Sequence, residues 1–324
     1  MLYCRTCGKR FAATQTTAFF GMHLTTETIQ AIIHHAAEGV GVRATARLLG
    51  LDKNLVNRAI LRAGEHCAAV LSSLLRSLSL TEVQLDELWA FVKKQSGSEA
   101  DEGEYGQKWI WTATDAPTRL LITFWIGGRE MDDARKMLDD LVARFTDKPL
   151  FTSDELSHYA EVLAQLFHTM VAAERTGKRG RPMNPVRVVD EDLDYAIVHK
   201  IRAARRVVKV ERKVIYGNAQ RIQVRLQESP SKTINIAYVE RTNLDWRLWD
   251  AHLVRKAPTF ARSQRWLKAK FAICVTVYNF VRPHSTLSRR EDRTFDPKTP
   301  AMAAGITERP WKIIDLLALP VMYQ

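Results

Sequence analysis

The chain has 324 residues, of which 46% are hydrophobic and 26% charged, as is ordinary for a folded globular protein with a sizeable core. Its four cysteines are too few for a disulfide framework, its start lacks an apolar signal core, and its apolar runs are too short to span a bilayer. These features exclude the disulfide-rich secreted and the membrane-spanning classes, and we expect a cytoplasmic protein. The net charge of +12 is uneven, because residues 1–174 carry 18 Lys and Arg against 22 Asp and Glu, whereas residues 175–324 carry 30 against 14. A basic half indicates a polyanionic partner, usually nucleic acid.

Residues 1–24 have the pattern of a partial zinc ribbon. Cys4 and Cys7 are separated by two residues, and a Gly-Lys-Arg sequence follows them like the turn of a zinc knuckle. Two thiolates can hold one side of a tetrahedral Zn²⁺, which needs four ligands in a structural site. No second cysteine pair follows at a suitable spacing, although His23 or the pair His34 and His35 could contribute. We therefore interpret the two cysteines as half of a zinc site and expect the other half upstream.

Residues 25–66 have the pattern of a helix-turn-helix DNA-binding domain. Thr25 or Thr26 is a suitable N-cap for a first helix, a short helix follows over residues 42–49, and Asp52 caps a third helix after a Gly-Leu turn. Arg and Asn match base edges in a major groove, and Lys and Arg match phosphates. The outward face that we expect to contact DNA consists of Lys53, Asn54, Asn57, Arg58 and Arg62. The alternative is a plain three-helix bundle with a solvated polar face.

From residue 81 the apolar pattern changes to short strands. The first expected strand, residues 83–92, contains Asp86, and Asp154 directly follows the fourth. The elements expected after the first strand are the strands 109–114 and 120–126, the helix 131–145, the strand 150–153 and the helix 155–167. Three antiparallel strands, a helix, a strand and a helix are the order of a ribonuclease H-like α/β fold with a mixed sheet. We assign residues 80–174 and 233–290 to such a catalytic core.

Other acids lie close to these two in the sequence. Glu87 and Glu155 are direct neighbours of Asp86 and Asp154, but side chains alternate along a strand, so we expect them to point elsewhere. Asp115 falls in a turn between strands, which favours a structural role. A further acidic cluster has no clear strand to position it and should be solvated, namely Asp190, Asp192 and Asp194.

Residues 175–232 carry 15 Lys and Arg against 6 Asp and Glu. We predict that they form an inserted basic α+β subdomain, which binds DNA phosphates or a partner protomer. Within it we expect a helix over residues 195–208 and two strands, 210–216 and 221–226, joined by a turn at Gly217 and Asn218. A flexible basic loop precedes them and should supply further DNA contacts, namely Lys178, Arg179 and Arg181.

Several motifs follow one another in a specific order. They include Asp-Glu-Leu-Trp at residues 86–89, Trp-Ile-Trp-Thr-Ala-Thr-Asp at 109–115, Glu-Arg-Thr-Asn-Leu at 240–244 and Tyr-Asn-Phe-Val-Arg-Pro-His-Ser at 278–285. Together with segments 247–263 and 299–306, they resemble the insertion-sequence-one family of DDE transposases. The interval between Asp154 and Glu240 is longer than the plain family pattern, and the excess corresponds to the predicted insertion. Residues 291–324 form a C-terminal tail.

The resemblance implies that the catalytic acids are Asp86, Asp154 and Glu240. It implies a two-metal mechanism in which Asp86 contacts both Mg²⁺ ions and the other two acids hold one each, with Mn²⁺ able to replace Mg²⁺. The three acids should stay ionised, because an adjacent dication favours the charged form. Basic residues at or beyond the third acid are also expected to contact DNA, namely Arg241, Arg247 and Arg282.

The expected function is therefore transposition. The protein would cleave double-stranded DNA at the inverted-repeat ends of an insertion sequence and transfer those ends to target DNA. Because two ends must be handled together, we expect a homodimer or a larger oligomer, associated with the nucleoid of a bacterium or archaeon. One alternative is a non-catalytic helix-turn-helix regulator derived from a transposase. Another is a ribonuclease H-like nuclease that shares the site but does not join strands.

Overall fold

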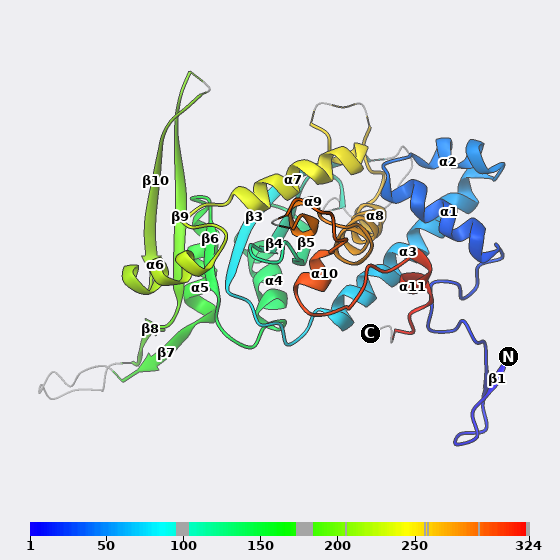
Figure 1. Ribbon diagram of the computed structural model, residues 1–324, viewed down its shortest axis with the longest axis horizontal. Coiled ribbons are helices and arrows are strands. Elements are labelled where there is room, and N and C mark those ends of the chain that lie inside the picture. The colour runs from blue at the N-terminus through cyan, green and yellow to red at the C-terminus, as the bar shows by residue number, and fades with distance from the viewer. Residues whose placement is uncertain are drawn as a thin grey trace, which may run out of the picture.

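Three helices follow a short N-terminal hairpin. The computed structural model describes residues 1–94, 104–172, 184–204, 206–255, 257, 259–290 and 292–321. The hairpin strands β1 (Leu2–Tyr3) and β2 (Arg10–Phe11) project from the body of the molecule, and the helices α1 (Thr26–Ala37), α2 (Val42–Leu49) and α3 (Lys53–Leu74) lie at one end of it (Figure 1). None of the described helices is both long and apolar enough to cross a membrane.

Local sequence signals explain where these helices begin and end. The Thr25 hydroxyl accepts a hydrogen bond from the Thr28 N–H, and the Asp52 carboxylate accepts one from the Asn54 N–H, which satisfies N–H groups that have no partner within their helices. Gly50, with φ of +65°, forms the left-handed turn between α2 and α3. The helix α3 extends past the predicted domain end at residue 66, because its buried apolar stripe continues to Leu71.

The centre of the molecule is a six-stranded mixed sheet with the order β10-β9-β6-β3-β4-β5. Its strands are β3 (Glu82–Val92), β4 (Gly106–Asp115), β5 (Leu121–Gly127), β6 (Leu150–Ser153), β9 (Asp194–Ala203) and β10 (Arg206–Tyr216). The strands β3, β4 and β5 are antiparallel, β6 is parallel to β3, β9 is parallel to β6, and β10 returns antiparallel to β9. This mixed α/β arrangement is consistent with the ribonuclease H-like core that the sequence predicts.

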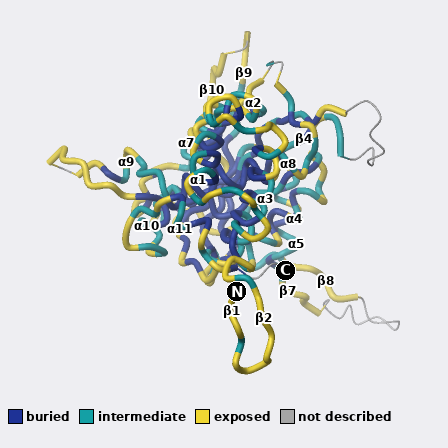
Figure 2. Tube along the Cα trace, turned by 90° about the vertical axis from the view of Figure 1, so that its right-hand side faces the viewer, coloured by how far each residue is buried: buried dark blue, intermediate teal, exposed yellow. Residues whose placement is uncertain are grey.

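Helices cover both faces of this sheet. On one face, Tyr159 of α5 packs edge-on against Trp111 of β4, and α4 lies beside β4 and β5. On the other face, α7 crosses β3 and β4, and Phe271 of α8 packs against Phe124 of β5. The covering helices are α4 (Met131–Val142), α5 (Ser157–Leu166), α7 (Ala237–Trp249) and α8 (Gln264–Thr276). Buried residues run through the middle of the molecule, whereas the hairpin β1–β2 and most of β10 are exposed (Figure 2).

The remaining elements connect or extend these layers. They are the hairpin β7 (His168–Val171) and β8 (Val186–Val189), the helix α6 (Ala219–Glu228), the 3₁₀ turn η2 (Ala251–Leu253), the π-helical turn η3 (Val277–Val281), and the short helices α9 (Ser285–Ser288), α10 (Pro300–Ala303) and α11 (Ile313–Ala318). The C-terminal tail packs back on the N-terminal helices. Its Leu316 carbonyl lies 3.0 Å from Nε2 of the buried His66, and the Ala18 N–H donates to the carbonyl of Leu317.

Two predictions within residues 175–232 are wrong. The segment 195–208, predicted as a helix, contains most of β9 and the start of β10, and the segment 221–226, predicted as a strand, lies within α6. Consequently Gly217 and Asn218 are not a hairpin turn, and Asn218 instead caps α6 by accepting hydrogen bonds from two backbone N–H groups. Since β9 and β10 belong to the main sheet, this part of the predicted insertion is continuous with the core.

Helix α3 is packed directly against helix α8 of the core. Gly64 lies at the crossing, where an added Cβ would be 2.2 Å from the carbonyl oxygen of Ala269. Nearby, the buried ammonium group of Lys270 donates to the carbonyl of Ala36 at the end of α1. The three N-terminal helices are therefore fixed to the core by backbone contact and share one hydrophobic core with it.

Candidate active site

Asp86 lies in the middle of β3, on the sheet face that α7 covers. Alternation along the strand places Gln84 on the same face, and both side chains contact α7. The Asn243 amide of α7 donates a hydrogen bond of 2.7 Å to the Asp86 carboxylate. Burial and the nearby charge of Asp154 raise the pKa of Asp86 to about 6, although the Asn243 hydrogen bond acts in the opposite direction.

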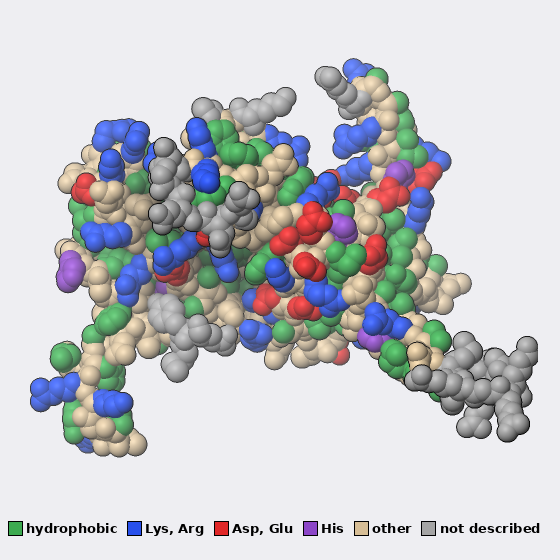
Figure 3. All heavy atoms as spheres, turned by 180° about the vertical axis from the view of Figure 1, so that it is seen from behind, with side chains coloured by type: hydrophobic (Ala, Val, Ile, Leu, Met, Phe, Trp, Pro, Cys, Tyr) green, Lys and Arg blue, Asp and Glu red, His purple; other side chains and the backbone are tan. Residues whose placement is uncertain are grey.

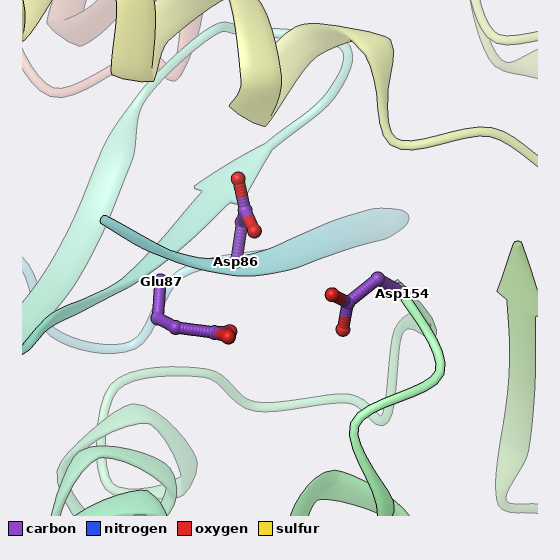
Figure 4. Close-up of side chains that lie close together, drawn as sticks. All are labelled: Asp86, Glu87 and Asp154. Carbon is purple, nitrogen blue, oxygen red and sulfur yellow. The ribbon is translucent and has the colours of Figure 1, made fainter. Parts of the chain in front are cut away.

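Asp154 follows β6 directly, and β6 is the parallel neighbour of β3. One carboxylate oxygen from each of Asp86, Glu87 and Asp154 lies within 4.8 Å of one from each of the others. In Figure 4, Asp86 points from β3 toward α7, whereas the carboxylates of Glu87 and Asp154 approach one another on the other side of the strand. The structure thus brings together two of the three predicted acids and adds a third that was not predicted.

The expectation that Glu87 points away from the site is wrong. Its Cβ does leave the strand on the face opposite Asp86, but two further bonds carry the carboxylate back toward Asp154. The nearly buried carboxylate is 2.5 Å from the Arg129 guanidinium and accepts a 3.2 Å hydrogen bond from the Tyr159 hydroxyl. Burial, followed by the charges of Asp154 and Asp86, raises the pKa of Glu87 to about 7.

Glu240 lies on α7 and is half-exposed. Its carboxylate forms an ion pair with Lys200 of β9 and is not part of the close group formed by Asp86, Glu87 and Asp154. Its charge nevertheless contributes to the raised pKa of Asp86. Glu155, in contrast, lies beyond the end of β6 and pairs with His199 of β9, so it is not part of this group, as expected.

The N-terminus of α7 is tied to β3 by buried polar contacts. The side-chain oxygen of Gln84 accepts hydrogen bonds from the N–H groups of Tyr238 and Val239, at 3.0 and 3.1 Å. Its amide nitrogen donates to the Glu82 carboxylate and to the Asn235 carbonyl, at 3.0 and 2.9 Å. Because α7 has no side-chain cap of its own, these contacts satisfy its first N–H groups and fix its position over Asp86.

Arg247 occupies the same face of α7 as Glu240 and Asn243, since the three residues are spaced by three and four positions. Burial and the neighbouring Arg255 lower the pKa of Arg247, whereas the nearby charge of Asp86 raises it. Its buried Nε has no hydrogen-bond partner among the described residues. A cation with an unused donor therefore lies close to the acids.

The other predicted DNA contacts have different surroundings. On α3, Lys53, Asn54, Asn57 and Arg58 are exposed, whereas Arg62 is partly buried, with its guanidinium 5.5 Å from the Phe20 ring centre. On α7, the exposed Arg241 is 3.8 Å from Asp245. Arg282 is not free, because it pairs with Glu38 and lies 4.0 Å from the Trp249 ring centre. The predicted contacts Lys178, Arg179 and Arg181 lie outside the described residues.

Cys4 and Cys7 lie at the turn of the N-terminal hairpin, where the Gly8 N–H donates to the Cys4 carbonyl. Hydrogen bonds from Cys7 lower the pKa of the Cys4 thiol, which favours the thiolate that binds metals. Among the residues that the structure describes, no third His, Cys or carboxylate ligand lies with this pair.

The remaining acids have structural surroundings. Asp115 accepts hydrogen bonds from the N–H and the hydroxyl of Thr118, in agreement with its predicted structural role. The prediction that Asp194 is solvated is wrong, because it is fully buried and pairs with Arg221 and Arg225 of α6. The two other acids of that cluster, Asp190 and Asp192, both form ion pairs with Lys148.

No protein-family model and no curated protein matches the chain. Among solved structures, the Mos1 transposase paired-end complex with the left transposon end aligns with 49% of this chain and 58% of its own, at 15% identity and a TM-score of 0.19. This chain therefore covers less than two thirds of that transposase. The Mos1 mariner paired-end complex with Mn aligns with 84% of this chain and 79% of its own, at 11% identity and a TM-score of 0.20. TM-scores this low support no inference about the activity of this chain.

Proposed function

We propose that this chain is a DDE transposase, with motifs that resemble the insertion-sequence-one family, and that it cleaves and joins DNA at the inverted-repeat ends of its element. The observation that carries the proposal is the meeting of Asp86 and Asp154 at two adjacent parallel strands, beneath the helix that carries Glu240. This arrangement brings carboxylates together where β6 ends beside the middle of β3. Its double-stranded DNA substrate accounts for the basic charge of the second half of the chain.

The donor set fits a hard divalent cation. Asp86, Glu87 and Asp154 offer only oxygen atoms as ligands. A cation between them would offset the energetic cost of their burial and of their mutual repulsion. Asp86 and Asp154 would hold Mg²⁺ or Mn²⁺, and Glu240 would join them after releasing Lys200. The ions, two in the mechanism that the resemblance implies, supply charge neutralisation at the scissile phosphate. Zn²⁺ at Cys4 and Cys7 belongs to the same proposal, with two further ligands from outside the described residues.

The protein groups around the acids have separate roles in this proposal. Asn243 holds the Asp86 carboxylate in one orientation through its 2.7 Å hydrogen bond. Arg247, with its unused Nε donor, binds the scissile phosphate and neutralises charge during in-line displacement. Arg129 keeps the Glu87 carboxylate beside Asp154. The 3′-hydroxyl freed by cleavage then attacks a phosphodiester of the target strand, so one bond breaks for each that forms.

The second candidate is a non-catalytic regulator that retains only the helix-turn-helix. One observation favours it: Glu240 is paired with Lys200 and stands apart from the other acids. The transposase and the regulator differ in the position of one side chain, because rotation of Glu240 toward Asp86 would complete the predicted catalytic set.

A strand-transfer assay distinguishes the candidates. The donor is DNA that flanks the gene, and wild type is compared with Asp154→Asn in Mg²⁺ and in Mn²⁺. The matched control is Asp192→Asn, which changes an exposed acid that forms an ion pair with Lys148. We expect joined products with wild type and the control and none with Asp154→Asn. Specific binding without cleavage or joining by any of the three proteins would instead establish the regulator, and cleavage without joining would indicate a nuclease.

A further inference from the structure

A cleft of about 870 Å³ lies between the N-terminal helices and the core, beside the place where α3 packs on α8. One wall comes from the turn between α1 and α2 and from the first turns of α3, and the other comes from residues 259–266 of the core. In Figure 1, the chain that follows α7 approaches α1 and α2 at this place. We propose that the cleft binds the phosphate backbone of a DNA duplex, so that the predicted helix-turn-helix and the catalytic core hold one DNA molecule together. This inference rests on the proposed function and names a surface of the core that contacts its substrate.

The accessible charges of the cleft are positive on both walls. Arg43 and Lys53 lie on the helical wall and Arg262 on the core wall, and all three are exposed. None of their side chains has a hydrogen bond or ion pair to another described residue. The lining acid, Asp250, is only 1% exposed and is bound by His252, so it does not offset these charges at the surface.

The unpaired cations of the cleft differ from a neighbouring arginine that is paired. Arg265, three residues after Arg262, is also exposed, but its guanidinium lies 2.6 Å from the Glu65 carboxylate. Unpaired cations on both walls of a cleft focus a positive potential there and attract an anionic ligand. On the back of the molecule, Lys and Arg gather over the side that carries the N-terminal helices (Figure 3).

The geometry of α3 indicates a duplex rather than an acidic protein. Lys53, Asn54 and Asn57 all line the cleft and come from the first turns of α3, the part of a recognition helix that enters a major groove. Asparagine and lysine in these positions match base edges and phosphates. With the start of α3 in the groove, one of the two flanking backbones would lie in the cleft against Arg262.

The two walls of the cleft are held at a fixed separation. The backbone contact of Gly64 with Ala269 joins α3 to α8, and Lys270 joins α1 to the same helix. On the core side, the Lys93 N–H donates a 2.9 Å hydrogen bond to the Ala261 carbonyl. Ala261 precedes Arg262 and forms a bridge to the end of β3, so the core wall is attached to the strand that carries the first catalytic acid.

The test measures DNA affinity of the full-length protein over a series of NaCl concentrations. A duplex from the element end is compared with an unrelated duplex, using Arg43→Ala, Lys53→Ala and Arg262→Ala, with Arg265→Ala as the matched control. Each of the first three should weaken binding and reduce the slope of log K against log salt by about 0.9, the value for one lost phosphate contact. The control should match wild type, and Arg262→Lys should restore most of the slope.

The outcomes separate this inference from the proposed function. If Arg43→Ala and Lys53→Ala reduce the slope but Arg262→Ala does not, the core wall does not touch DNA and the inference is wrong, while the transposase proposal stands. If Arg262→Ala changes self-association in sedimentation but not DNA binding, the cleft takes a second copy of the chain and the inference is wrong. If Asp154→Asn binds with the wild-type slope but joins no strands, the cleft and the chemistry are independent, as we expect. If wild type binds neither duplex, both proposals are wrong.

Discussion

Asp86 and Glu87 are consecutive residues with different partners. Asp86 is oriented by an amide from α7, and Glu87 by a guanidinium and a phenol on the opposite face. Both are pressed toward Asp154, which helps to raise the pKa of one to about 6 and of the other to about 7. At the scale of single residues, a bound cation would offset the cost of holding these carboxylates together.

The hydrogen bond from Asn243 to Asp86 predicts a measurable effect on metal binding. Asn243→Ala removes the donor that fixes the carboxylate, and we expect the affinity for Mn²⁺ to fall by about tenfold, as for other residues that orient metal ligands. Titration calorimetry with Mn²⁺ measures this. Asn54→Ala, an exposed asparagine of α3, is the control, and equal affinities for the two variants would contradict the prediction.

Asp250 predicts a pH-dependent contribution to stability. Burial alone would raise its pKa, but the contacts with His252 and the charge of Lys270 outweigh burial and hold the pKa below its usual value. Such a contribution is fully present above the unfolded pKa of about 3.9 and is lost as the pH falls through the folded pKa. Asp250→Asn should therefore lower the free energy of unfolding by about 2 kcal/mol at pH 7 and by less near pH 3. Urea unfolding at both pH values measures this, and an equal loss at both would contradict it.

At the scale of elements, the position of α7 depends on a side chain of β3. Gln84 is fully buried and accepts two of the first N–H groups of α7, while its amide nitrogen binds Glu82 and Asn235. A strand residue two positions before Asp86 thus sets where Asn243 lies above it. The strand and the helix form one unit.

Gln84→Leu removes this attachment and leaves buried donors and acceptors unpaired. We expect a loss of about 2 kcal/mol in the free energy of unfolding. We also expect weaker joining activity in protein that is still folded, because α7 shifts relative to Asp86. Urea unfolding and the strand-transfer assay measure the two effects. The control is Gln107→Leu, an exposed position of β4, and a Gln84→Leu variant as stable and active as this control would show that α7 is held by other contacts.

The strands β3 to β6 were predictable because their signals are local, and β9 was not. Tyr195, Ile197 and their neighbours are buried on both faces of the sheet, so apolar residues run without alternation and also fit a buried helix. In α6, the apolar residues Ile222, Val224 and Leu226 alternate like a strand, but Val224 is 56% exposed and only the other two are buried. Whether such a segment forms a strand or a helix depends on the elements that pack against it. A single sequence does not specify these partners.

The same distinction applies to the candidate site. Asp86 and Asp154 were predictable because each lies at a position defined by its own strand. Glu87 was not, because its place depends on side-chain torsions and on the cation Arg129 supplied by a distant loop. The approach of Glu240 was expected from its motif, and its pairing with Lys200 follows from β9, the strand that was mistaken for a helix.

At the scale of the whole molecule, the N-terminal helices and the core behave as one body. Gly64→Ala tests this, because its Cβ would be 2.2 Å from the Ala269 carbonyl oxygen and two backbones would have to separate. We expect a loss of about 2 kcal/mol or more in the free energy of unfolding, as for other overpacked contacts. Gly41→Ala is the control, since nothing lies within 4 Å of its added Cβ. Unfolding curves that coincide for the two variants would contradict the prediction.

The helix α3 is a single rod of 22 residues, about 33 Å long, with its first turn at the proposed DNA cleft and its middle locked to α8. In the proposed transposase, this rod would keep a constant distance between the recognised bases and the cleaved bond. At the ends of the element, natural substitutions should therefore be tolerated differently from natural insertions and deletions. Between the recognised bases and the terminus, substitutions should accumulate freely, whereas insertions or deletions approaching half a helical turn, about five base pairs, should disappear from active copies.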